Sequence, residues 1–351
     1  MKTIQVVVIA SLLLILSACA KNIEKQIFDF SVKLVDIPEE GTLHELCLSS
    51  EADFDLMGWM IVDSLVIQYQ PMADFFFSIN SLITGERLMQ LCRRGRGPNE
   101  MISVVPWFNI WNGYMTIVDI VNTTCYQIDF KKSVECGTTE QFAQSHFNTG
   151  VDESLGSLPV YVVGKDSLLT YQIPRDKQQA PYYLLFDLGT GGKIAEYKPF
   201  ILPRNLKGVG NMELPDLYYA THTIRPDGRK TCMAMRRLPQ LNIMDTKTGE
   251  VFGIRLRNVP GFQQERSFCF FSSVCSDDQF IYAIYFQKSR DEFERGGSRL
   301  LIFDWDGNPV SNIPLEMPVE QVQITNGKLY FSCNYQLNSH LYEFKSKNQS
   351  K

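Results

Sequence analysis

The feature that most constrains the fold is a short turn followed by an apolar strand, which recurs six times along the chain. The copies read DSLVIQY, NGYMTIVD, KDSLLTYQI, DGRKTCMAM, DDQFIYAIYF and NGKLYFSCN, and they begin at Asp63, Asn112, Lys165, Asp227, Asp277 and Asn326. Successive copies start between 49 and 62 residues apart. Such a period is typical of repeat folds, in which one supersecondary unit is used several times.

Two further sets of residues recur at matching positions in the six units. Two or three positions before each copy begins stands a β-branched aliphatic residue, as a strand buried between neighbouring sheets requires: Ile61, Ile110, Val162, Ile224, Val274 and Ile324. A third strand follows each second strand. Five of the six third strands end in a residue whose side chain can bond the backbone two residues on: Asn80, Asp129, Asp187, Asp245 and Asp304. Each unit therefore predicts a four-stranded antiparallel blade of a β-propeller.

The sequence thus predicts an all-β fold, a single six-bladed β-propeller over residues 27–346 with a polar tail at 347–351. No amphipathic helix is expected within it. The last unit lacks a fourth strand, and an orphan strand pattern, Ile27–Val35, precedes the first unit. We predict that this N-terminal strand completes the last blade and closes the ring, because a paired edge is protected from aggregation. Loops are expected at 141–158, 199–217 and 287–298.

Residues 1–18 have the pattern of a lipoprotein signal peptide. Lys2 precedes an apolar run of 13 residues from Ile4 to Leu16, which is short for a transmembrane helix. The junction Leu16-Ser17-Ala18-Cys19 matches the lipobox of bacterial lipoproteins, so we expect lipidation at Cys19 and a tether over residues 19–26. By analogy with enterobacterial sorting, Ala20 favours the outer membrane. The alternative is an ordinary secretory peptide with a chance cysteine.

Composition narrows the function classes. The net charge of −5 argues against nucleic acid as a partner, because a phosphate-binding surface is normally basic. The cysteines form no CxxC pair and the four histidines have no metal-ligand spacing, so we expect neither a metal nor another cofactor. Cys232 and Cys333 fall within strand patterns, which favours mostly unpaired, buried thiols. Disulfides are the alternative in an exported protein.

Three groups of residues are candidates for ligand binding. Arg94, Arg96 and Glu100 belong to the densest charge cluster, whose guanidinium groups suit an anion or an acidic sugar. The competing interpretation is a structural loop with arginine paired to Glu100 and glycines at positive φ. His222 and Arg225 lie at a predicted first strand, which would line the propeller's central channel, although a histidine satisfied within the sheet is the alternative.

The tryptophans form the third group. Trp107, near Trp59 and Trp111 in the first two units, could stack on a sugar ring. In a propeller with 12% aromatic residues, burial in the core is the competing interpretation.

The segment from Arg94 to Met101, RGRGPNEM, is similar to the GxGPGEF segment that opens NHL-type repeats. Together with the lipobox, the chain resembles the TolB-like, NHL-like six-bladed propeller lipoproteins of the Bacteroidetes. The blade pattern covers nearly the whole mature chain, whereas the signature occurs once, with Asn99 and Met101 in place of the family's Gly and Phe. The resemblance implies a propeller fold and a location in the cell envelope.

We therefore expect a lipid-anchored envelope propeller that acts as a binding or interaction scaffold for an envelope protein or a carbohydrate. The alternative is an envelope hydrolase or lyase acting on carbohydrate, with carboxylates in its loops. No GxSxG elbow or P-loop occurs. The residues directly before these β-branched positions are all neutral, unlike the acidic inner-strand ligands of calcium-dependent lactonases: Met60, Asn109, Tyr161, Thr223, Ser273 and Gln323.

Overall fold

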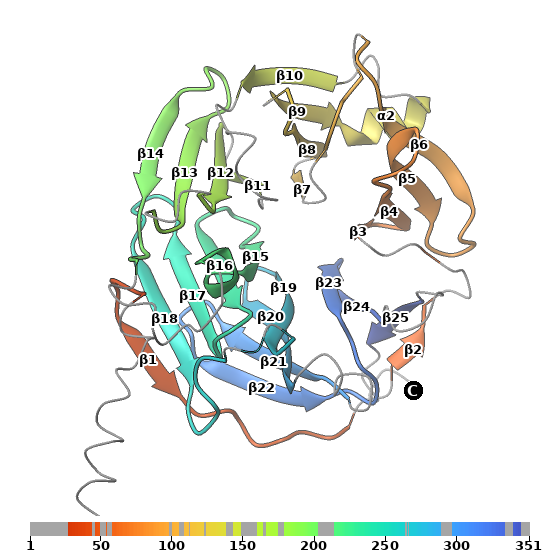
Figure 1. Cartoon of the computed structure of the whole chain (residues 1–351). Coiled ribbons are helices and arrows are strands. Elements are labelled where there is room, and N and C mark those ends of the chain that lie inside the picture. The colour runs from red at the N-terminus through yellow and green to blue at the C-terminus, as the bar shows by residue number, and fades with distance from the viewer. Residues whose placement is uncertain are drawn as a thin grey trace, which may run out of the picture.

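The computed structural model describes residues 27–43, 46–49, 54, 58–97, 100–104, 109–111, 113–122, 124–137, 143–148, 160–163, 166–174, 179–202, 214–263, 265, 267–288, 297–333 and 340–344. These residues form six sheets arranged as blades around a central axis (Figure 1). The predicted all-β, six-bladed propeller is confirmed. The predicted signal peptide, tether and Cys19 lie outside the described residues, as do the polar tail and most of the three predicted loops.

Within each blade, consecutive strands follow one another from the axis outward. Blade 1 is β3 (Trp59–Val62), β4 (Leu65–Tyr69), β5 (Phe75–Ser81) and β6 (Arg87–Arg93). Blade 2 is β7 (Asn109–Trp111), β8 (Tyr114–Asp119), β9 (Thr124–Asp129) and β10 (Ala143–Asn148). Blade 3 is β11 (Val160–Val163), β12 (Ser167–Gln172), β13 (Tyr182–Asp187) and β14 (Lys193–Tyr197).

The second half of the ring repeats this order. Blade 4 is β15 (Ala220–Ile224), β16 (Lys230–Met235), β17 (Gln240–Asp245) and β18 (Val251–Leu256). Blade 5 is β19 (Cys269–Ser276), β20 (Phe280–Lys288), β21 (Arg299–Asp304) and β22 (Pro309–Pro314). Blade 6 is β23 (Gln321–Thr325), β24 (Lys328–Ser332) and β25 (Leu341–Phe344), completed by β2 (Leu46–Leu48). The first and second strands of each predicted unit are therefore found as neighbours in one sheet.

The Asx residues at the ends of the third strands start the next turn by side-chain hydrogen bonds. Asp245 accepts from the backbone N–H groups of Lys247 at 2.9 Å and Thr248 at 2.8 Å. Asp304 accepts from Asp306 N–H at 3.0 Å in the same way. Asn80 and Asp129 differ: the Asn80 amide bonds Gln68 within the sheet, and Asp129 caps a helix.

The core is divided among the interfaces between neighbouring blades, which we call seams. The buried apolar side chains of the described residues form six clusters, one at each seam. The seam between blades 5 and 6 is typical: Ile284 of β20 packs with Phe331 of β24, and both have no exposed surface. Since each blade buries both faces, the second strands are apolar on successive residues rather than alternating.

Five cysteines lie in these seams, as predicted for buried thiols: Cys92, Cys125, Cys232, Cys269 and Cys275. Burial raises the pKa of Cys125 to about 12 and that of Cys269 to about 11, which keeps both thiols protonated at neutral pH. Cys47, Cys136 and Cys333 are less buried and are also free thiols.

An N-terminal strand closes the ring, as predicted, but it is not Ile27–Val35. β1 (Val32–Val35) pairs in parallel with β18 as a fifth strand of blade 4. The outer strand of blade 6 is β2, which pairs antiparallel with β25 from Leu46 opposite Phe344 to Leu48 opposite Tyr342. The assignment was wrong because β2 has only three residues and makes no visible strand pattern, whereas the longer apolar run was free to pair with the uncovered edge of blade 4.

Before and after β1, the N-terminal segment, residues 27–43, runs along the outer edges of several blades. Ile27 accepts a hydrogen bond from Ile201 N–H at 3.1 Å, and Phe28 forms a bridge with Phe200 just beyond β14. Farther along, Gly41 N–H donates to Asn312 O of β22 at 2.9 Å. The segment therefore links the edges of blades 3, 4 and 5 before β2 joins blade 6 (Figure 1).

Among the described residues, two short helices that the sequence patterns did not predict interrupt the β structure. α2 (Phe130–Cys136) follows β9, and α3 (Leu214–Leu217) precedes β15. Asp129 caps α2 by accepting from Lys132 N–H at 3.1 Å, and Gly137 ends it at φ 70°. Within the described part of the chain, neither helix has the length and apolar character needed to cross a membrane.

Gln323 joins the first and last blades at their inner strands. Its side-chain oxygen accepts from Ile61 N–H at 3.0 Å, and its side-chain nitrogen donates to Trp59 O. One amide of β23 thus satisfies a donor and an acceptor on the free edge of β3. This contact reinforces the closure that β2 provides at the outer edge.

Replacing Gln323 by Ala is expected to lower the free energy of unfolding by about 2 to 3 kcal/mol, because a partly buried N–H and C=O lose their partners. Urea denaturation followed by circular dichroism measures the change. Gln279, exposed in the β19–β20 turn, provides the control, and its replacement by Ala should cost less than about 0.5 kcal/mol. Equal midpoints for the two variants would contradict the role given to Gln323.

Candidate functional sites

The loop that leaves β6 carries the arginine-rich motif. Glu100 accepts from Gly97 N–H at 2.8 Å, and its other oxygen lies 3.6 Å from Arg93 Nε. A Cβ placed on Gly95 would come within 1.8 Å of the Glu100 carboxylate, so a larger residue here would displace that side chain. The Glu100 carboxylate therefore stabilises the conformation of this loop through Gly97 and Arg93.

Arg94 is also bound to its surroundings. Its Nε donates to Ala73 O at 3.1 Å, a terminal nitrogen donates to Pro71 O, and the guanidinium lies 4.2 Å above the Phe76 ring. These contacts attach the loop to the β4–β5 connection of the same blade. Arg96 is exposed on the loop surface, so of the two predicted arginines it is the one presented to solvent.

Asp119 is a key residue of this region that sequence reasoning did not select. Its side chain is fully buried at the end of β8. The carboxylate accepts from the N–H groups of Ile102 at 2.8 Å and Ser103 at 3.3 Å, and also from Val121 and Asn122. It therefore ties the loop leaving blade 1 to blade 2. The available signal was that Asp119 ends a second strand, where the other five copies have no acid.

His222 lies on β15 but faces the aromatic side chains of blade 3. Its ring centroid is 4.6 Å from that of Tyr171 and 6.2 Å from that of Tyr183. Burial lowers the pKa of His222 to about 3, with an opposing effect from a backbone hydrogen bond of Ala220. Its Nε2 is buried and makes no hydrogen bond to any described residue. The imidazole is therefore neutral and packs within the seam between blades 3 and 4.

Arg225 does not join His222 in a common site. Its Nε lies 3.6 Å from Asp227 Oδ2 in the turn after β15. His222 and Arg225 thus contact different groups, and both lie in blade 4, across the ring from the loop of blade 1 (Figure 1). The structure does not bring the sequence-predicted candidates together.

The buried histidine predicts a distinct pH dependence of stability. Because the folded-state pKa is below the ordinary value of 6.5, the neutral histidine stabilises the fold fully above pH 6.5, and this stability is lost as the pH falls toward 3. Through this histidine, the wild type should lose about 2 kcal/mol of its free energy of unfolding between pH 6.5 and 5. His222→Phe should not show this loss. Urea unfolding of both proteins at pH 7.5, 6.5 and 5 provides the test. Parallel profiles for wild type and variant would refute the assignment.

Three of the four tryptophans bond to structural partners. The indole N–H of Trp59 donates to Ser332 Oγ at 3.1 Å, and that of Trp305 donates to Asp277 O at 2.9 Å. Trp111 donates to Pro226 O at 3.4 Å. Trp107, the candidate for sugar stacking, lies outside the described residues.

Polar side chains on the inner strands are used to join blades. Ser273 Oγ accepts from Val322 N–H at 3.1 Å, and the Thr223 and Ser276 hydroxyls lie 2.9 Å apart across the seam between blades 4 and 5. In the described part of the chain, no three His, Cys, Asp or Glu residues come close enough to hold a metal ion.

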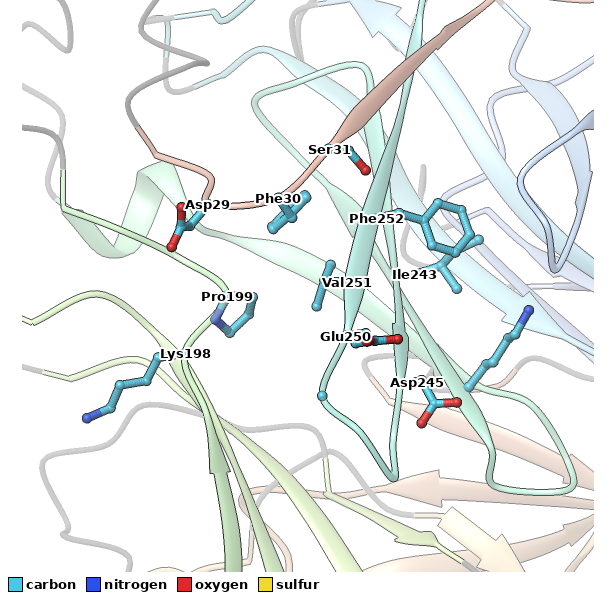
Figure 2. A pocket seen from close by; sticks show the side chains of 12 residues that line it. Asp29, Phe30, Ser31, Lys198, Pro199, Ile243, Asp245, Glu250, Val251 and Phe252 are labelled. Atoms are coloured by element: carbon cyan, nitrogen blue, oxygen red, sulfur yellow. The ribbon is translucent and has the colours of Figure 1, made fainter.

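A cavity of about 660 Å³ opens at the outer edge between blades 3 and 4. Figure 2 shows Asp29 and Phe30 of the N-terminal segment on one side, and Glu250 and Val251 of blade 4 on the other. Pro199 forms part of the wall where the chain leaves blade 3. The cavity exists because the N-terminal segment crosses from Phe200 to β18 and leaves the beginning of β18 uncovered.

Comparison with known proteins finds similarity in structure alone. No family model matches the chain, and no curated protein matches it either. The likeness is one of fold. A member of the DUF4221 family from Bacteroides vulgatus is similar with a TM-score of 0.56 and 10% identity, over 86% of this chain and 98% of that one. A protein from Bacteroides fragilis described as exported is similar with a TM-score of 0.50 and 10% identity, over 90% and 100% of the two chains. The TolB-like and NHL-like resemblance therefore remains a prediction.

Proposed function

We propose that this protein is a lipid-anchored propeller of the bacterial cell envelope that acts as a binding or interaction scaffold. The observation that carries the proposal is that polar side chains on inner strands form hydrogen bonds to the neighbouring blade. Gln323 forms such bonds between the first and last blades. Three of the six seams are fastened in this way, and all six contain a buried apolar cluster, so the ring is rigid. Such a ring suits the precise placement of binding loops.

The location rests on the start of the chain. The lipobox predicts acylation of Cys19, and several acyl chains together anchor a protein stably. The similar protein from Bacteroides fragilis is described as exported, which supports an envelope location. The segment RGRGPNEM and the lipobox favour a place among the TolB-like propeller lipoproteins. We favour the outer membrane because Ala20 follows the cysteine.

The binding surface we favour includes the loop of blade 1. Arg94 and Glu100 fix its conformation through contacts to Pro71, Ala73 and Gly97. Arg96 is thereby presented to solvent on a fixed backbone, where its guanidinium suits a carboxylate of an envelope protein or of an acidic carbohydrate.

A turnover assay separates a scaffold from an envelope enzyme. Purified protein incubated with neutral and acidic envelope polysaccharides should release no new reducing ends and no unsaturated products. Titration of the same oligosaccharides by calorimetry then tests binding directly, with Arg96→Ala expected to weaken binding of acidic ligands. Product formation that disappears when one carboxylate is replaced would contradict the scaffold role.

A further inference from the structure

The path of the N-terminal segment fixes the place at which a membrane anchor would leave the propeller. Ile27 is fully buried and hydrogen bonded to Ile201, and Asp29 N–H donates to Pro199 O at 3.3 Å. Only seven residues lie between Cys19 and Ile27, so eight Cα–Cα steps join them. Even fully extended, that length spans roughly 28 Å. An anchor at Cys19 therefore keeps the outer edge of blades 3 and 4 close to the bilayer.

Side chains that suit a lipid interface lie on and beside the outer strands of blades 3 and 4. Leu34 on β1, Ile194 on β14 and Ile201 beyond β14 expose 51%, 52% and 38% of their surface. Lys193 and Lys198 flank them, with 54% and 69% of their side chains exposed. Apolar side chains can enter the headgroup region while lysine ammonium groups remain at the level of the phosphates.

The segments that carry these residues are held together. The Lys193 and Lys198 ammonium groups both contact Glu196, at 2.9 Å and 2.5 Å. The Tyr197 hydroxyl donates to Thr246 O of blade 4 at 3.1 Å, which fixes the end of β14 against the next blade. We define the outer rim as Leu34, Lys193, Ile194, Lys198 and Ile201. Lys198 of the rim also lines the cavity of Figure 2.

We propose that the outer rim is a membrane-contacting surface that lies on the phospholipid bilayer. This inference rests on the proposed lipid anchoring, since the position of Cys19 brings the rim to the membrane. The rim faces the lipid, and the loop of blade 1, on the opposite side of the ring, faces away from it (Figure 1). The anchored propeller thus presents Arg96 to partners rather than to the membrane.

Lysine labelling on vesicles tests the rim without requiring acylation. The chain from Cys19 onward, with an N-terminal histidine tag, is held on phosphatidylglycerol–phosphatidylcholine vesicles by nickel-chelating lipid and acetylated briefly, with the vesicle-free protein as reference. Lys132 and Lys328 are matched controls, because they are 62% and 57% exposed and each pairs with one carboxylate, as the rim lysines do. Vesicles should slow acetylation of Lys193 and Lys198 by about threefold or more and leave the controls unchanged.

A pair of double variants adds a second criterion. Ile194→Glu with Ile201→Glu should abolish the protection of the rim lysines, whereas Ile83→Glu with Leu88→Glu, on the exposed edge of blade 1, should preserve it. Equal labelling of rim and control lysines, or protection of Lys132 and Lys328 instead, would overturn the proposal. Absence of acylation at Cys19 in the natural protein is a separate result and would overturn the anchoring, not the lipid affinity of the rim.

Discussion

Deleting residues 27–49, with the preceding residues retained, is expected to leave a chain without a cooperative thermal transition. The deletion removes four side chains that are at most 8% exposed: Ile27, Phe28, Val35 and Leu46. Each buried side chain contributes about 1.5 to 3 kcal/mol, so the loss approaches the whole stability of an ordinary domain, about 5 to 15 kcal/mol. It also exposes the edges of β18 and β25.

Single substitutions locate the effect in the closing strand. Leu46→Ala should cost about 2 to 5 kcal/mol, because Leu46 packs in the seam between blades 5 and 6. Leu43→Ala, at a position 53% exposed, should change the free energy of unfolding by less than about 0.5 kcal/mol. Calorimetry of the three variants provides the measurement. A deletion variant that melts like the wild type would show that β2 does not close the ring.

Asp119→Ala is expected to be the most destabilising substitution of a single polar residue. It removes the acceptor for four backbone N–H groups and for the Asn122 amide. Since each buried donor left unpaired costs about 1 to 3 kcal/mol, a total of about 4 kcal/mol or more follows. Urea denaturation should show this loss. Asp119→Asn keeps one acceptor oxygen and the side-chain volume, so its free energy of unfolding should lie between those of the wild type and Asp119→Ala.

The same substitution should release the loop of blade 1. Trypsin is expected to cleave after Arg94 or Arg96 faster in Asp119→Ala than in the wild type, because Ile102 and Ser103 are no longer held. Asp306→Ala serves as the control: its side chain is 81% exposed and pairs with Lys230, so a change below about 1 kcal/mol is expected. Similar stability for the two variants would contradict the role of Asp119.

The blade pattern was visible in the sequence because each unit repeats the same local chemistry. The turns at Asp63 and Asn326 need residues that tolerate positive φ, and the structure has φ 54° and 50° there. The ends of the ring were harder to predict. β2 is too short to form a pattern, and Ile27–Val35 fits any open edge, so the sequence alone could not decide between blade 4 and blade 6.

Contacts distant in sequence explain what was missed at the candidate sites. Asp119 acts on Ile102 and Ser103, and Gln323 acts on Trp59 and Ile61 more than 260 residues away. No local pattern reveals such pairs. The alternative interpretation of the arginine cluster, a structural loop, describes Arg94 and Glu100 well, whereas Arg96 stays a candidate for ligand binding.

The intact mass of the protein purified from its natural envelope tests the central claim most directly. Lipid anchoring predicts a chain that begins at Cys19 and carries the mass of a diacylglycerol group on the thiol. A chain that begins at another residue, or one that begins at Cys19 with an unmodified thiol, would contradict the account.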